Sequence, residues 1–457
     1  MRRSWWGGLL RALVTGLVLV AGLALPMVAP QPAQAVPPGT YAYVANFHSD
    51  TVSVINTATN TVVVTVPVGD APWGVAVSPD GTRAYVTNRA ANTVSVINTA
   101  TDTVDATVPV GLEPLGVAVS PDGTRAYVTN YSDATVSVIN TATNTVVATI
   151  PVGDTPVGVA VSPNGTRAYV TNSDDDTVSV INTATNTVVA TVPVGDLPFG
   201  VAVSPDSTRA YVTNSDDDTV SVINTATNTV VATVPVGDVP QGVAVSPDGT
   251  RAYVINANAD TVSVINTATN MVVATVPVGD APREVAVSPD GTRAYVTNAN
   301  ADTVSVINTA TNTVVATVPV GDLPFGVAIG VVPPPTPSTC ATATATITGT
   351  NGNDILTGTP SDDVIFALAG DDVVDGRGGN DLICGGDGND VLTGGNGNDR
   401  VEGGNGDDGL SGGAGNDANY GGPGNDTLNG GAGTNTNDGG SGHNSCTNPT
   451  TGPGCNI

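Results

Sequence analysis

The sequence predicts an all-β protein made of two kinds of repeat, and three observations support this prediction. β-Branched residues, Gly and Asn are abundant, whereas Lys is absent and helix formers such as Glu and Leu are scarce. The string Ala-Tyr-Val recurs seven times, 42 residues apart. From residue 349 onward, a pattern rich in Gly and Asp recurs every nine residues. Fixed periods of these kinds indicate repeat architectures.

The length and charge of the chain limit its function classes. Its 457 residues are too many for one ordinary domain. The net charge is -28, from 13 basic and 41 acidic residues, and such an acidic chain should be repelled by nucleic acid. Two His and an aromatic content of 4% leave little material for a conventional active site.

The first 35 residues are predicted to be a signal peptide. Arg2, Arg3 and Arg11 precede an apolar run over residues 12–25. Ala33-Gln34-Ala35 fits the small-x-small cleavage rule. The alternative is a membrane anchor, but this run is short for crossing a bilayer. No later apolar stretch is long enough to do so. We therefore expect a bacterial protein that is secreted or held at the cell surface, without membrane insertion after cleavage.

Each 42-residue period contains four strand-like runs. In the first complete copy these are residues 75–78, 83–87, 93–97 and 104–110. Two sequences that favour turns separate these runs. Ser-Pro-Asp-Gly lies between the first and second runs, and Asn-Thr-Ala-Thr lies between the third and fourth. Four short antiparallel strands per repeat, seven times, predict a seven-bladed β-propeller.

The ends of the repeat array distinguish a closed ring from a linear β-solenoid. The copy around Tyr43 lacks its first strand, and an extra strand, residues 326–329, follows the last complete copy. The C-terminal strand therefore closes the ring and removes its open edges. We expect the propeller over residues 36–331, a Pro-rich linker over 332–339 and a second domain over 340–457.

The repeat unit resembles a known family. Three segments carry the resemblance: Ala-Tyr-Val-Thr-Asn, Thr-Val-Ser-Val-Ile-Asn and Val-Pro-Val-Gly. They are similar to the YVTN-type β-propeller repeat of exported and surface-layer proteins, and the similarity covers residues 39–331. The resemblance implies a fold but no particular function, because propellers support binding, scaffolding and several chemistries.

The nine-residue repeat has Gly at its first, second and fourth places and an aliphatic residue at its eighth. Asp fills the sixth place in nine copies: Asp354, Asp363, Asp372, Asp381, Asp390, Asp399, Asp408, Asp417 and Asp426. This pattern resembles the hemolysin-type (RTX) calcium-binding repeat over about 100 residues. The resemblance implies a parallel β-roll in which two nonapeptides form one coil.

The chemistry of the nonapeptide suits calcium. Gly lets the backbone turn tightly through positive φ and expose its carbonyl oxygens, and Asp adds a hard carboxylate. Ca²⁺ takes six to eight such oxygens, so we expect several calcium ions, best held between Asp381 and Asp426. The alternative is a disordered acidic tail. Five departures weaken the early and late copies: Pro360, Ser361, Ala367, Asn435 and Asn444.

The four cysteines lie in or beside the predicted roll: Cys340, Cys384, Cys446 and Cys455. Disulfides are expected in an exported protein, and three pairings are possible. We favour Cys340 with Cys384 and Cys446 with Cys455, as staples at the two ends of the roll. A zinc site is the alternative, but the chain lacks the CxxC spacing.

Variation among the seven repeats predicts a ligand face. The loops at one end of the blades differ from copy to copy, and so does the residue after the linking Pro. Drift in exposed loops would give the same variation. The candidate ligand-face residues are Trp73, Phe199, Phe325, Asp174, Asp175, Asp216 and Asp217.

Three functions remain open. The first is a secreted or cell-surface calcium-binding protein, monomeric, whose propeller binds an extracellular protein or glycan without catalysis. The second is an exported propeller enzyme of the lyase, lactonase or quinoprotein type. Such enzymes need clustered His, acidic metal ligands or cofactor-binding residues towards the central channel, and the sequence supplies almost none of them. The third is a purely structural surface spacer. We favour the first.

Overall fold

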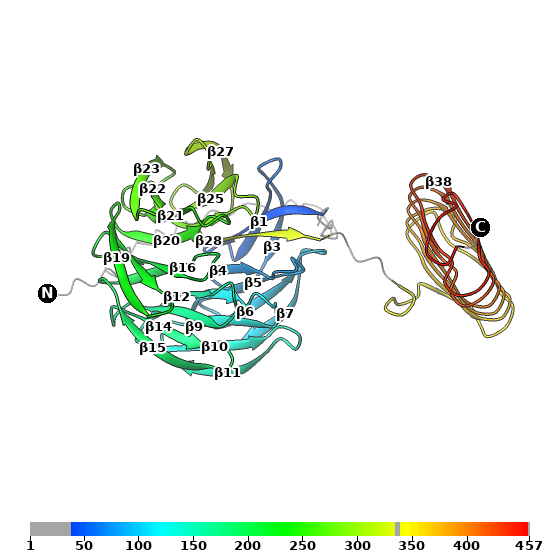
Figure 1. Ribbon diagram of the computed structural model, residues 1–457, viewed down its shortest axis with the longest axis horizontal. Helices are drawn as coiled ribbons and strands as arrows, with labels where there is room; N and C mark the ends of the chain where they lie inside the picture. The colour runs from blue at the N-terminus through cyan, green and yellow to red at the C-terminus, as the bar shows by residue number, and fades with distance from the viewer. Residues whose placement is uncertain (1–37, 334–338, 456–457) are drawn as a thin grey trace, which may run out of the picture. The chain divides into compact units, whose positions relative to one another are not determined.

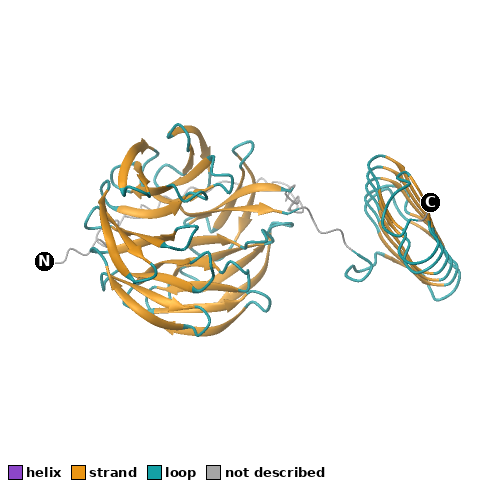
Figure 2. Cartoon of the chain, viewed as in Figure 1, coloured by secondary structure: helices purple, strands orange, loops and turns teal. Residues whose placement is uncertain are grey.

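The computed structural model describes residues 38–333 and 339–455. These ranges contain strands and turns but no helix, so no described helix could cross a membrane (Figure 2). The predicted signal peptide lies outside the described residues. The chain divides into two compact units, Met1–Pro334 and Pro335–Ile457.

The first unit is a propeller of seven four-stranded antiparallel blades, as predicted, with the inner strands around the centre of the ring (Figure 1). We number the blades from the one that contains the first strand. From the channel outward, the strands are β28 (Pro324–Val332), β1 (Gly39–Asn46), β2 (Thr51–Asn56) and β3 (Thr61–Pro67) in blade 1; β4 (Pro72–Val77), β5 (Arg83–Asn88), β6 (Thr93–Asn98) and β7 (Thr103–Pro109) in blade 2; β8 (Pro114–Val119), β9 (Arg125–Asn130), β10 (Thr135–Asn140) and β11 (Thr145–Pro151) in blade 3; β12 (Pro156–Val161), β13 (Arg167–Asn172), β14 (Thr177–Asn182) and β15 (Thr187–Pro193) in blade 4; β16 (Pro198–Val203), β17 (Arg209–Asn214), β18 (Thr219–Asn224) and β19 (Thr229–Pro235) in blade 5; β20 (Pro240–Val245), β21 (Arg251–Asn256), β22 (Thr261–Asn266) and β23 (Met271–Pro277) in blade 6; and β24 (Pro282–Val287), β25 (Arg293–Asn298), β26 (Thr303–Asn308) and β27 (Thr313–Pro319) in blade 7.

The C-terminal strand closes the ring, as the sequence predicts. β28 pairs antiparallel with β1, with Val332 opposite Gly39 and Val327 opposite Val44. Because β28 continues to Val332, that residue belongs to the strand and not to the linker that we predicted to begin there. Ring closure leaves no unpaired inner strand in blade 1.

The core of the propeller lies between the blades. Tyr85, Val94 and Val96 of blade 2 pack against Val117 and Val128 of blade 3, and equivalent clusters recur around the ring. The middle strands are buried on both faces, which explains why neither of their faces is strongly polar in the sequence.

The second unit is a parallel β-roll of two six-stranded sheets. Its register advances by 18 residues, since Ile365 lies opposite Ile383, so two nonapeptides form one coil. The eighth-place side chains build the thin core between the sheets. One sheet contains β29 (Ile347–Thr348), β31 (Val364–Ala369), β33 (Leu382–Asp387), β35 (Arg400–Asn405), β37 (Ala418–Tyr420) and β39 (Thr436–Asp438); the other contains β30 (Ile355–Thr357), β32 (Val373–Asp375), β34 (Val391–Asn396), β36 (Gly409–Ala414), β38 (Thr427–Ala432) and β40 (Ser445–Thr447).

Candidate functional sites in the roll and at the channel mouth

The sixth-place Asp residues form hydrogen-bonded ladders along the turns of the roll. The Oδ1 atom of Asp399 accepts the backbone N–H of Asp381, one coil earlier, at 2.8 Å. The N–H of Asp399 donates in turn to Asp417 at 2.9 Å. The ladder on the other side of the roll runs from Asp354 to Asn444 in the same way. Each carboxylate is thereby held in one orientation.

The second carboxylate oxygen lies near a backbone carbonyl oxygen of the next coil. At Asp399, Oδ2 and the carbonyl oxygen of Gly412 lie 2.4 and 2.6 Å from the point where a Cβ on Gly394 would be. Such a meeting of acceptors is unfavourable unless a cation or a proton lies between them. Seven Asp residues have a buried Oδ2 that accepts no hydrogen bond from any described group: Asp372, Asp381, Asp390, Asp399, Asp408, Asp417 and Asp426.

This donor set fits calcium. Among the described residues no three His, Cys, Asp or Glu side chains gather around one point, because each turn offers one carboxylate and otherwise backbone carbonyls. Hard cations such as Ca²⁺ bind carbonyl oxygens readily, whereas structural zinc sites are built from Cys and His. The residues that would hold the ions are Asp381, Asp390, Asp399, Asp408, Asp417 and Asp426 with the Gly carbonyls beside them. The ions would neutralise the carboxylates and tie adjacent turns together.

The buried carboxyl groups are poor anions in the absence of a cation. Burial raises the pKa of Asp408 to about 7 and the pKa values of Asp381 and Asp399 to about 6. A bound cation favours the charged form and opposes this shift.

The first two copies and the last copy pair these oxygens with protein donors. The N–H and hydroxyl of Thr350, which stands where the repeat has Gly, donate to Oδ2 of Asp354 at 2.5 and 2.9 Å. Thr359 does the same for Asp363. At the C-terminal end, the amide of Asn444 donates to the carbonyl of Gly439 at 2.7 Å. In these copies hydrogen bonds from the protein already satisfy some of the oxygens that a cation would otherwise coordinate.

Both disulfides that we favoured from the sequence are present. Cys340 is bonded to Cys384 on β33, and Cys446 on β40 is bonded to Cys455. All four cysteines are therefore oxidised, which leaves no thiolate for zinc.

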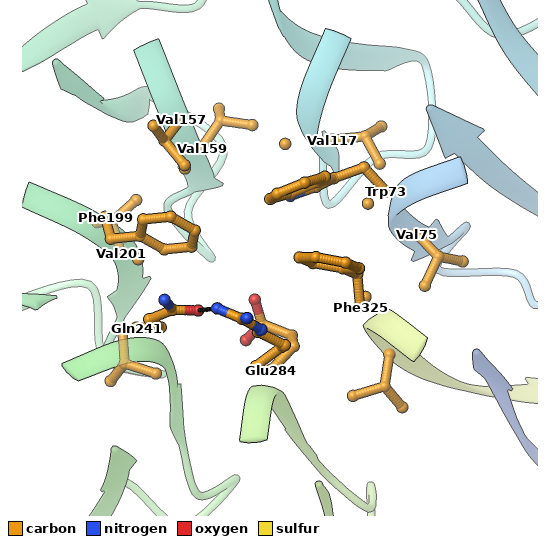
Figure 3. A pocket seen from close by; sticks show the side chains of 18 residues that line it. Trp73, Val75, Val117, Val157, Val159, Phe199, Val201, Gln241, Glu284 and Phe325 are labelled. Atoms are coloured by element: carbon orange, nitrogen blue, oxygen red, sulfur yellow. Dashed lines mark hydrogen bonds between the residues drawn. The ribbon is translucent and has the colours of Figure 1, made fainter. Parts of the chain in front are cut away.

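The mouth of the propeller channel holds a cavity of about 200 Å³, lined by 18 residues from the inner strands of all seven blades (Figure 3). Trp73, Phe199 and Phe325 line this cavity and are partly exposed. The rings of Trp73 and Phe325 stack at a centroid distance of 4.0 Å, and Phe199 lies across the mouth from them. A ligand role for these three residues stays a prediction.

The four candidate Asp residues lie at the same end of the propeller but outside the cavity lining. Pro198, at the start of inner strand β16, lies opposite Asn214, and the loop with Asp216 and Asp217 follows directly. Asp217 accepts the backbone N–H of Asp196 at 2.9 Å, and Asp175 likewise accepts that of Asp154. These two carboxylates therefore brace the links between blades, and all four are exposed at the rim.

Three polar residues in the mouth are not among the candidate ligand-face residues predicted from the sequence: Gln241, Arg283 and Glu284. The sequence feature that could have revealed Glu284 is its position in the repeat. The other six blades have Gly there: Gly74, Gly116, Gly158, Gly200, Gly242 and Gly326. A Cβ on Gly116 would lie 2.5 Å from the carbonyl oxygen of Val157 in the next blade, which explains why Gly prevails.

The charged groups of the mouth are not paired with each other. Arg283 donates from Nη1 to Oε1 of Gln241 at 3.2 Å, and its guanidinium lies 5.3 Å from the ring centroid of Phe325. Its Nε is buried and has no described acceptor. Glu284 accepts a hydrogen bond from the N–H of Val285, and burial raises its pKa to about 7. The ion pairs found over residues 38–333 and 339–455 involve other residues, Arg89 with Glu113 and Arg400 with Glu402.

Comparisons with protein families agree with both repeat assignments. Residues 348–383, 385–418 and 420–446 match the RTX calcium-binding nonapeptide repeat. Residues 8–130 match the YNCE-like β-propeller, and residues 201–323 match the lactonase 7-bladed β-propeller. None of the curated proteins matches the chain.

Several solved structures share the propeller. Hydrazine synthase of Kuenenia stuttgartiensis is 25% identical, with a TM-score of 0.52, over 56% of this chain and 88% of that one. A protein of unknown function from Desulfotomaculum acetoxidans is 22% identical, with a TM-score of 0.58, over 63% and 98%. A putative 6-phosphogluconolactonase from Bacteroides uniformis is 18% identical, with a TM-score of 0.56, over 64% and 99%. The last two likenesses concern the fold alone. By its fold the chain is a seven-bladed β-propeller followed by a parallel β-roll; parts of the propeller match the YNCE-like and lactonase propeller models, and the roll matches the RTX calcium-binding nonapeptide repeat.

Proposed function

We propose that the chain is an exported protein whose propeller binds an extracellular protein or glycan, while its roll folds around calcium. The observation that carries the calcium part is the buried Oδ2 of Asp399 facing a carbonyl oxygen. Export is supported by the leader-like residues 1–35, the two disulfides and the RTX repeats. N-terminal sequencing of the protein recovered from the culture medium and cell envelope tests it. A chain beginning at Val36 is expected, and an intact Met1 in the cytoplasm would contradict export.

The propeller part of the proposal rests on the channel mouth. Aromatic side chains, an amide and two charged groups converge on one cavity there, whereas the other end of each blade carries nearly identical turns. A concave cavity in which polar groups converge beside aromatic side chains is a usual form of ligand site. We assign it to binding without catalysis, because neither a nucleophile with its base nor a metal-binding side-chain cluster is found in the described part of the propeller.

The experiment compares wild type with a mouth variant in binding to glycan arrays and cell-envelope extracts, with calcium present. The variant combines Trp73→Val, Phe199→Val and Phe325→Val, since Val157 is the natural residue at this place in blade 4. Loss of a wild-type interaction in the variant supports the proposal. Equal binding by both proteins would refute it, and binding of nothing by either would favour the structural spacer.

A propeller enzyme is the second candidate, and Glu284 is the observation that favours it. A carboxyl group with a pKa of about 7 inside a cavity has the properties of a general acid or base. The match of residues 201–323 to the lactonase propeller points to a lactone as the substrate. Hydrolysis of glucono-δ-lactone by wild type, lost in Glu284→Gln, would favour this candidate over binding alone.

A further inference from the structure

Arg283 and Glu284 carry opposite charges into the same small cavity. Both line the mouth from inner strand β24, and neither has an ion-pair partner among the described residues. Both side chains are half-buried, and a charge partly removed from water without a partner is unfavourable, so the fold retains two of them only with compensation. Pairing with charges on a ligand would provide it.

The backbone of the ring is also altered at this place. In blade 5, Oγ1 of Thr213 accepts the N–H of Gly200 and donates to the carbonyl of Gln241 in the next blade, at 2.8 and 2.6 Å. The same bridge recurs in blades 2, 3, 4 and 7. In blade 6 the Thr is replaced by Ile255, which has no hydroxyl.

Glu284 lies at the junction that lacks this bridge. Its Oε1 lies 2.5 Å from the point where a Cβ on Gly242 would be, and the carbonyl oxygen of Arg283 lies 2.8 Å from it. The other blade without the Thr is blade 1, where Ala45 replaces it, and its neighbour blade 2 carries Trp73. The two blade junctions that lack the Thr bridge therefore border the polar and aromatic part of the mouth.

The remaining walls and the rim restrict the ligand. Phe199, Val157 and Val201 form an apolar wall across from Phe325 and Trp73 (Figure 3). Exposed carboxylates, including Asp174, Asp216 and Asp217, surround this end of the propeller and oppose entry of a simple anion. A neutral sugar would leave both half-buried charges unpaired.

We propose that the channel mouth binds a small zwitterion, namely an α-amino acid with an apolar side chain. Its carboxylate pairs with Arg283, its ammonium group with Glu284, and its side chain packs against the wall around Phe199. This assignment rests on the proposed function in that it uses the same binding site, but its ligand is a small molecule and not the protein or glycan proposed above. Charge-assisted hydrogen bonds at both ends give the selectivity, since removal of either ligand charge leaves a buried group unpaired.

The fluorescence of Trp73 can report ligand binding in the mouth. It is the only Trp of the sequence beyond residue 35, and it stacks on Phe325 in the mouth. The chain from Val36 to Ile457, with calcium, is titrated with L-leucine, L-valine, L-methionine and L-phenylalanine while Trp73 fluorescence is recorded. The amide and the N-acetyl derivative of the best ligand serve as probes that each lack one charge, and glucose is the neutral probe.

We expect saturable binding of at least one amino acid and at least ten-fold weaker binding of both derivatives. Glu284→Gln and Arg283→Met should each weaken it at least ten-fold, which corresponds to about 1.4 kcal/mol. Glu284→Gly, which restores the residue of the other six blades, should fold normally and lose binding as well. Asp280→Asn, an exposed change at the same end, is the control and should bind like wild type.

Three results would overturn the assignment: no response to any of the four amino acids, equal binding of the amide or N-acetyl derivative, or undiminished affinity in both charge variants. The proposed function is judged separately by the mouth variant with glycans and extracts. If that variant loses an interaction while no amino acid binds, the zwitterion assignment fails and the binding face stands.

Discussion

Oδ1 of Asp408 accepts the backbone N–H of Asp390 at 2.8 Å, and Oδ2 of the same carboxylate is buried without a donor. One oxygen thus joins two coils of the roll, and the other is left for a cation. Since the same arrangement recurs from Asp372 to Asp426, the roll should need calcium to be stable.

Removal of calcium should unfold the roll and leave the propeller folded. The thin aliphatic core cannot offset the repulsion of so many carboxylates together with the backbone entropy of a Gly-rich chain. We expect circular dichroism of residues 340–457 to show little β structure in chelator and a gain at millimolar calcium, with magnesium a poor substitute. A fully folded fragment in excess chelator with its disulfides reduced would contradict this account.

Asp408→Asn should raise the calcium concentration at the folding midpoint, whereas Asp407→Asn should leave it nearly unchanged. The two residues are neighbours and lose the same charge. Asp407 is exposed and occupies a place where Asn389 and Asn425 occur naturally. Asn at 408 keeps the Oδ1 acceptor but places an amide against acceptor oxygens. Calcium titrations followed by circular dichroism compare the two variants, and equal midpoints would rule out Asp408 as a ligand.

The two disulfides should contribute unequally to the stability of the calcium-loaded roll. Cys340 and Cys384 are 44 residues apart, and Cys446 and Cys455 are nine apart. Loop-closure entropy predicts about 4 kcal/mol for the longer loop and about 3 kcal/mol for the shorter one. Urea unfolding of the two double Cys→Ala variants measures the difference. A larger loss from the Cys446 and Cys455 pair would show that native contacts outweigh loop length.

Glu284 should make the propeller less stable as the pH rises. Its pKa is about 7 in the folded state and about 4.5 when unfolded, so the folded state binds the proton more tightly. The resulting stability is fully present below pH 4.5 and is lost as the pH rises through 7, which amounts to about 3 kcal/mol. Relative to wild type, Glu284→Gln should therefore gain stability between pH 4.5 and 7 and keep that gain above it. Urea unfolding followed by Trp73 fluorescence tests this, and a constant difference across the range would contradict it.

The sequence determined both architectures, because each is a consequence of periodicity. Seven copies of Ala-Tyr-Val at a fixed spacing predict seven blades, and the missing first strand before Tyr43 predicts the closure by β28. The resemblance of the nine-residue period to the RTX repeat implies coils of two nonapeptides, and the 18-residue register confirms them. A repeating pattern of turns and apolar residues permits few arrangements, so local propensity and global fold agree.

Only the tertiary structure decided which departures from the repeats meet. Gln241, Arg283 and Glu284 lie on neighbouring blades and share one cavity, whereas Asp217 and Asp175, equally suggestive in the sequence, hold backbone amides outside it. Likewise, Thr350 donates to the carboxylate of Asp354, a contact that depends on the turn geometry. A repeat pattern specifies what is common to all copies. The role of a residue found in one copy depends on its neighbours from other copies, and ring closure and coil stacking bring those neighbours together.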